Sequence, residues 1–187
     1  MMIRLLKTTL LAIFMGSLVF CAESQADTHK AEILTYMDTI AKIAPIGNKA
    51  ESIYRKCLFL KYREKTLSDD NFKMIIRDKI IPTYDDFISR YEALQSEIKT
   101  EELKSVHKFY TLAAKDAAGA FPLMIQSFEA ENANSRDSIV SHINKSLQES
   151  ALNFQKWGTL FSQLAAKNEV IDDDKNWYRD TLIDDSG

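Results

Sequence analysis

Few residues of this chain could do chemistry, and they are widely spaced. The three histidines, His29, His107 and His142, share no motif, and none has a Glu or His at the spacing that a helical metal site requires. The chain lacks the Glu-x-x-His motifs of di-iron bundles, calcium-loop spacing and a glycine-rich phosphate loop. No serine lies in a GxSxG or SxxK setting. The sequence therefore predicts no catalytic residue, no metal and no cofactor.

The elements that would position any site are helices. In the stretch from about Ser135 to Lys167, apolar residues recur at alternating steps of three and four, which is typical of one helix face. Three earlier segments, at about 28–65, 68–98 and 100–128, show the same spacing. The stripe of the last segment is Val140, Ile143, Leu147, Ser150, Phe154, Trp157, Phe161 and Leu164.

The length of the chain and its few turn residues predict one all-α domain. The 187 residues are 45% hydrophobic, with five Gly and three Pro, and no Asn-Gly or Asp-Gly hairpin turn occurs. Short connections between long helices favour an up-down-up-down four-helix bundle over residues 27–168. We expect the first helix to be kinked or broken at Pro45, with Asn48 and Glu51 forming a capping box for a second start.

Residues 1–26 have the features of a secretory signal peptide. Arg4 and Lys7 precede an apolar segment from Leu10 to Phe20, and a small-residue cleavage site follows at 24–26. The chain is therefore expected to be exported, to the periplasm or beyond, with no transmembrane span after removal of the signal.

Two alternatives to cleavage after Ala26 stay open. One is cleavage after Ser24. The other is a lipid anchor at Cys21, because residues 18–21 resemble a bacterial lipoprotein box, although Phe20 replaces its small residue. Removal of Cys21 leaves Cys57 without a disulfide partner, and its apolar neighbours predict a buried thiol.

Counting from the turns between helices places four residues at roughly one level of the bundle. This candidate pocket layer is Ile53, Thr83, Ala117 and Ser150. Small facing side chains either leave a cavity that holds a ligand or let the helices close up, with Ser and Thr bonded to carbonyls one turn back.

Charge is unevenly distributed along a chain whose formal net charge is −3. Residues 169–187, the acidic C-terminal tail, hold seven acidic and two basic residues, whereas residues 49–65 hold six basic and two acidic residues. The tail could fold back on this basic segment, bind a partner, or be a frayed terminus. The candidate partner surface is Arg55, Lys56, Asp172, Asp173, Asp174 and Trp177.

These features predict a binding protein that docks another protein in the cell envelope, as an inhibitor or immunity-type protein or as an accessory subunit. The slight acidity argues against nucleic acid as the partner. The alternative is a periplasmic small-molecule binder that uses a mid-bundle cavity.

Overall fold

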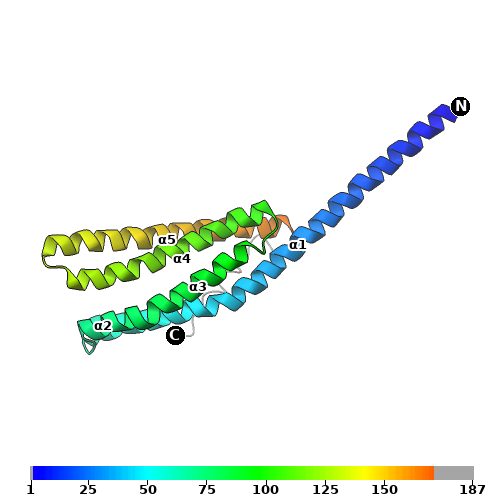
Figure 1. Cartoon of the computed structure of the whole chain (residues 1–187). Helices are drawn as coiled ribbons and strands as arrows, with labels where there is room; N and C mark the ends of the chain where they lie inside the picture. The colour runs from blue at the N-terminus through cyan, green and yellow to red at the C-terminus, as the bar shows by residue number, and fades with distance from the viewer. Residues whose placement is uncertain (1, 171–187) are drawn as a thin grey trace.

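The protein is helical almost throughout in the computed structural model, which describes residues 2–170 and their side chains from residue 27 onward (Figure 1). No strand occurs in this part of the chain, so the predicted all-α class is confirmed. The elements are α1 (Met2–Leu58), the π-helical turn η1 (Phe59–Arg63), α2 (Asp69–Ile75), the π-helical turn η2 (Ile76–Ile80), α3 (Ile81–Gln95), α4 (Glu101–Glu129) and α5 (Ala133–Lys167).

These elements form four rods, because η1 continues α1 and η2 joins α2 to α3 without a break. In Figure 1, α4 and α5 lie side by side, and α3 lies between α4 and α1. Lys167 pairs with Glu102 at 3.0 Å, and the hydroxyl of Ser150 donates to the carbonyl of Ala113 at 2.8 Å. The residue numbers thus run in opposite directions along α4 and α5.

The first rod has no break at Pro45, since α1 continues on both sides of this residue. The expected second helix start at Asn48 is therefore wrong, and a kink at Pro45 stays a prediction. Proline removes a single helix hydrogen bond, and on either side of it Ala44 and Ala50 are buried. Packing against α3 thus holds the helical path where local sequence alone predicts an interruption.

The predicted start of the second rod is confirmed, because the Ser68 side chain accepts a hydrogen bond from the N–H of Asn71 at 3.2 Å. Thr100 precedes α4 as expected, but its side chain makes no capping hydrogen bond. Instead, the carboxylate of Glu32 on α1 accepts from the backbone N–H groups of Lys99 and Thr100. A side chain from another rod thereby ties α1 to the turn before α4.

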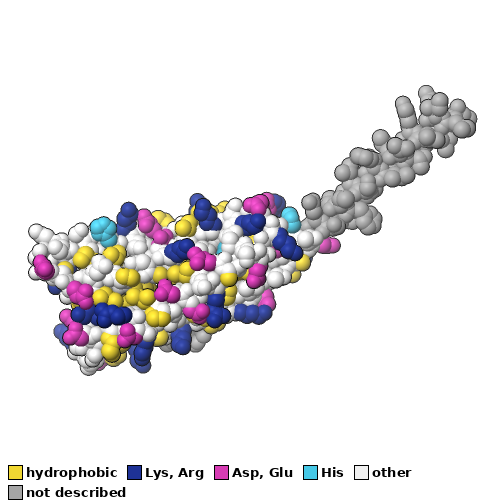
Figure 2. Space-filling view, in the orientation of Figure 1, with side chains coloured by type: hydrophobic (Ala, Val, Ile, Leu, Met, Phe, Trp, Pro, Cys, Tyr) yellow, Lys and Arg dark blue, Asp and Glu magenta, His cyan; other side chains and the backbone are white. Residues whose placement is uncertain are grey.

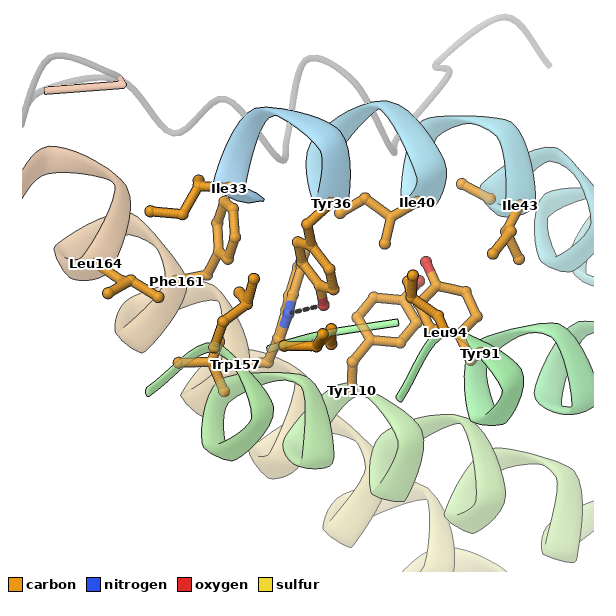
Figure 3. Close-up of a cluster of buried hydrophobic side chains, with 14 of the residues drawn as sticks. Ile33, Tyr36, Ile40, Ile43, Tyr91, Leu94, Tyr110, Trp157, Phe161 and Leu164 are labelled. Atoms are coloured by element: carbon orange, nitrogen blue, oxygen red, sulfur yellow. Dashed lines mark hydrogen bonds between the residues drawn. The ribbon is translucent and has the colours of Figure 1, made fainter. Parts of the chain in front are cut away.

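Two groups of buried apolar side chains form the core. Cluster 1 takes residues from all four rods and is rich in aromatic rings (Figure 3): Ile33, Tyr36, Ile40, Ile43, Ala44, Phe87, Tyr91, Leu94, Ile98, Leu103, Val106, Tyr110, Ala114, Trp157, Phe161, Leu164 and Ala165. Cluster 2 lies toward the η1 end and is mainly aliphatic: Cys57, Phe72, Ile76, Ile80, Ala120, Phe121, Met124, Ile125 and Ile143. Cys57 is buried, as its neighbours in sequence predicted.

The predicted stripe of the last helix is only partly correct. Val140 and Leu147 are 40% and 39% exposed. In its first half α5 packs mainly on α4, where Ser146 donates to the carbonyl of Asp116 at 2.7 Å and Ile143 is buried. With a single neighbour, only a narrow face is covered, and the flank that carries Val140 and Leu147 stays open to solvent.

Candidate functional site

A groove lies between α1 and the η2–α3 part of the second rod, and it is the candidate site of this chain. It has a volume of about 740 Å³ and is open to solvent. Its walls are Pro45, Ile46, Lys49 and Ile53 from α1, with Asp78, Lys79, Pro82, Thr83 and Asp86 from the second rod. A smaller groove of about 330 Å³ adjoins it, shares Asp78 and Lys79, and is also lined by Leu67, Asn71, Met74 and Ile75. We call these the main groove and the side groove.

The backbone beside the main groove departs from α-helical geometry. The N–H of Ile81 bonds to the carbonyl of Ile76, five residues back, which defines the wide π-helical turn η2. Pro82 follows in the first turn of α3, inside the unbroken second rod, so the wide turn lies directly before a residue that has no N–H to donate. Thr83 satisfies its hydroxyl within the helix by donating to the carbonyl of Lys79 at 2.6 Å. Pro82 and Thr83 both line the groove at this turn.

The lining of the groove carries two lysines and two aspartates, and among the described side chains the pairing of Asp86 with Arg90 leaves two lysines beside one unpaired aspartate. Asp86 is paired with Arg90 at 3.0 Å, whereas no ion pair of the described residues involves Lys49 or Lys79. Asp78 is the other acidic residue of the lining. An apolar floor with lysines at its edge favours a ligand segment that is itself apolar and flanked by acidic groups.

The structure divides the predicted pocket layer between two places. Ile53 and Thr83 line the main groove. Ala117 and Ser150 lie on α4 and α5, where the Ser150 hydroxyl bonds to the carbonyl of Ala113 on the neighbouring helix. The Thr83 hydroxyl donates to a carbonyl one turn back in its own helix, as expected. The Ser150 hydroxyl instead donates to a carbonyl of α4, across the α4–α5 contact.

The candidate partner surface is described only in part. Arg55 and Lys56 are exposed on α1, and Arg55 pairs with Glu51 at 2.7 Å. Asp172, Asp173, Asp174 and Trp177 lie outside the described residues. Figure 2 shows acidic and basic side chains mixed over the visible face of the bundle.

Sequence reasoning missed most of the groove lining, including Lys49 and Lys79. A signal was present, because Lys49, Ile53 and Lys56 are spaced by four and three residues, as are Lys79, Thr83 and Asp86. Each set therefore shares one helix face, although the sequence does not show that these two faces meet.

A buried hydrogen-bond chain crosses the bundle next to cluster 1, and sequence reasoning missed it as well. The indole N–H of Trp157 donates to the hydroxyl of Tyr36 at 3.3 Å, drawn as a dashed line in Figure 3. That hydroxyl lies 3.2 Å from Nδ1 of His107, and Nε2 of His107 lies 2.8 Å from the carbonyl oxygen of Tyr91. We call this set the polar chain. It joins α5, α1, α4 and α3 in turn.

The partners assign the protonation state of His107. A carbonyl oxygen only accepts, so Nε2 carries the proton and Nδ1 accepts from the Tyr36 hydroxyl. Burial lowers the pKa of His107, although its hydrogen bond to Tyr91 opposes this shift. Burial also disfavours the charged form of Tyr36 and so raises the pKa of its hydroxyl, although the hydrogen bond from Trp157 opposes this shift. Both groups are neutral at pH 7, and their role here is to position four helices.

The described side chains contain no group of three His, Cys, Asp or Glu residues arranged to hold a metal ion. Burial raises the pKa of the Cys57 thiol, which keeps it protonated and unreactive. In the same part of the chain, no helix combines the length and apolar character needed to cross a bilayer.

Comparison with protein-family models, with curated proteins and with solved structures finds no match for this chain. The residues of the main groove and its rim are thus what remains to indicate a function.

Proposed function

We propose that this chain is an exported helical-bundle protein that docks another protein in the cell envelope, and that the main groove is the docking site. The observation that supports this most is the combination of an open apolar groove with a lysine rim. Inhibition of a toxic enzyme and service as an accessory subunit of an assembly would both use such a surface.

The expected occupant is a short apolar segment of the partner with acidic neighbours. Pro45, Ile46, Ile53 and Pro82 supply apolar surface that becomes buried on binding. Lys49 and Lys79 would then face acidic groups of the partner at the edge of the interface. Charge pairs at such an edge mainly accelerate association and select the partner, while the buried apolar contacts supply most of the affinity.

The scaffold suits recognition by a preformed surface. The polar chain and cluster 1 connect all four rods, so the two walls of the groove belong to elements that are held in register. A preorganised groove loses little conformational entropy when a partner binds.

Site-specific photo-crosslinking in the envelope tests this function. A photoreactive amino acid replaces Lys49 at the rim, and the matched control replaces Leu152, which is 57% exposed on α5 and outside the groove. We expect one discrete crosslinked protein from position 49 and none from position 152. Adding Lys79→Glu to the chain that carries the photoreactive residue at position 49 should strongly reduce that product while the helical circular-dichroism spectrum is unchanged. The same product from both positions would contradict the proposal.

A small-molecule ligand is the second candidate, because a groove of about 740 Å³ is within the size range of ligand pockets, roughly 300 to 1,000 Å³. Native mass spectrometry and an absorbance scan of protein purified from its envelope compartment separate the two candidates. An added small mass or a visible band, lost in Thr83→Arg, would favour a ligand. An added polypeptide would favour docking.

A further inference from the structure

The way α5 ends directs the following residues back onto the bundle. Glu169 has a left-handed backbone conformation with φ of 55°. Its N–H bonds to the carbonyl of Ala166 at 2.9 Å, and the N–H of Val170 bonds to the carbonyl of Ala165 at 2.9 Å, which is a Schellman motif. Val170 then packs against cluster 1. The seventeen residues 171–187, which we call the tail segment, therefore start at the bundle surface.

This exit lies at the end of the bundle that contains Glu32 of α1. The Lys167 side chain near the end of α5 pairs with Glu102 in the first turn of α4. The Glu32 carboxylate accepts from the N–H of Thr100, immediately before that turn. The end of α5, the start of α4 and Glu32 thus share one level.

The tail segment is long enough to reach the main groove from this level. Trp177 is seven residues beyond Val170, a span of about 24 Å when extended. Pro45, at the near end of the main groove, is thirteen residues beyond Glu32 on α1, which at 1.5 Å per residue is about 20 Å along the helix. An extended tail segment running along α1 therefore brings Trp177 and Tyr178 to the rim of the groove.

The tail segment contains a second apolar pair, Leu182 and Ile183, and its distance from Trp177 allows it to reach the side groove. Leu182 lies five residues beyond Trp177, or about 17 Å in an extended chain. Thr83 in the main groove and Ile75 in the side groove are eight residues apart along the second rod, or about 12 Å. Leu67, Met74 and Ile75 give the side groove apolar surface, and the Met74 side chain is 50% exposed.

The charges of the two surfaces are complementary. The tail segment carries six acidic and two basic residues, and three of the acidic residues, Asp180, Asp184 and Asp185, follow Trp177. On the bundle, Lys49 and Lys79 line the groove beside Asp78 and Asp86, of which Asp86 is paired with Arg90, and the exposed Lys56 shares the helix face of Lys49 and Ile53. Within the described residues no ion pair involves any of these three lysines.

We propose that the tail segment binds along α1 in cis, with Trp177 and Tyr178 in the main groove and Leu182 in the side groove. Covalent connection gives a short tether an effective concentration of the order of millimolar, so weak contacts suffice. A partner that uses the main groove must then displace the tail segment, which makes the chain self-inhibited. This regulatory consequence rests on the proposed function, whereas the contact itself does not.

Fluorine NMR of the full chain labelled with 5-fluorotryptophan tests the contact without any partner. The sequence has two tryptophans, and Trp177→Phe assigns their signals. We expect the Trp177 signal to lie away from that of a free peptide of residues 171–187. Thr83→Arg, which fills the groove, should move it to the free-peptide position, whereas Leu152→Arg should not. The buried Trp157 reports in every sample whether the core is intact.

Three outcomes would overturn the proposal. They are a Trp177 signal at the free-peptide position in the unmodified chain, a displaced signal that neither Thr83→Arg nor Lys49→Glu changes, and a displacement that disappears on dilution. The last would indicate binding to a second copy. If Thr83→Arg shifts the Trp157 signal, the core has changed, and the effect of Lys49→Glu at the exposed rim on the Trp177 signal then decides the test. Failure here leaves docking of a partner intact, and failure of the crosslinking experiment leaves the tail contact intact.

Discussion

The two halves of the core are built differently. Cluster 1 surrounds aromatic rings that are oriented by hydrogen bonds, since Trp157, Tyr36 and His107 form the polar chain. Tyr54 packs against cluster 2, and its hydroxyl donates to the sulfur of Met124, a weak acceptor, at 3.3 Å. Hydrogen bonds thus orient the side chains of cluster 1. Cluster 2, which lies beside the main groove, is held mainly by the burial of apolar side chains.

The rings of cluster 1 also pack in defined geometries. Tyr91 and Tyr110 stack with centroids 4.3 Å apart and planes 8° apart, and Tyr110 meets Trp157 edge to face at 4.7 Å. Such pairs contribute roughly 0.5 to 1.5 kcal/mol beyond the area that they bury. Substitutions in cluster 1 should therefore cost more than comparable ones in cluster 2.

The largest expected effect is that of Trp157→Ala, which should lower the free energy of unfolding by about 3 to 5 kcal/mol, because a fully buried ring is lost. Ile80→Ala in cluster 2 should cost about 3 kcal/mol. Urea unfolding monitored by circular dichroism measures both. A loss below about 1 kcal/mol for Trp157→Ala would show that cluster 1 is not the main core.

A matched pair of tyrosine substitutions isolates the hydrogen bonds. Tyr36→Phe leaves the indole N–H of Trp157 and Nδ1 of His107 without their partner, which should cost about 2 kcal/mol. Tyr54→Phe removes a weak contact with sulfur and should cost less than about 1 kcal/mol. If both substitutions lowered the free energy of unfolding equally, the hydrogen bonds of the polar chain would not distinguish cluster 1 from cluster 2.

The polar chain should also make stability depend on pH. Because the folded pKa of His107 lies below its ordinary 6.5, the contribution of this residue is fully present above pH 6.5 and is lost as the pH falls toward the folded pKa. Lowering the pH from 7.5 to 5.5 should therefore lower the free energy of unfolding. His107→Gln should abolish this loss, whereas substitution of the exposed His142 by Gln should preserve it.

The titration of Glu32 falls outside the range from pH 7.5 to 5.5. Partial burial tends to raise the pKa of Glu32, but hydrogen bonds from Lys99 and Thr100 bring it below 4.5. Glu32 therefore loses its stabilising contribution only at lower pH. A pH loss that persists in His107→Gln would mean that another group titrates in this range.

The smallest effects are expected at two glycines. A Cβ at Gly47 would lie 2.8 Å from the ring of Phe87, which cluster 1 holds in place, so Gly47→Ala should destabilise by about 1 kcal/mol. A Cβ at Gly119 would meet only the Ser146 hydroxyl, at 3.7 Å, so Gly119→Ala should stabilise by about 0.5 to 1 kcal/mol through helix propensity. Thermal unfolding distinguishes these signs, and stabilisation by both would show that Phe87 can move.

The sequence by itself determined the helical class and much of the core. Within the predicted segment 68–98, Phe72, Ile76, Ile80 and Phe87 follow the steps of three and four residues and are buried, because helical periodicity is a local property. Counting from turns also selected Ile53 and Thr83, which line the main groove.

Only the tertiary structure decided which faces are covered. Val140 follows the same spacing as the buried Ile143 but is exposed, because only a narrow face of this part of α5 is covered. Pro45 interrupts the pattern yet lies inside a continuous helix. The meeting of the Lys49 and Lys79 faces, and of Tyr36 with His107, depends on how rods distant in sequence pack together, and that arrangement is a property of the whole chain.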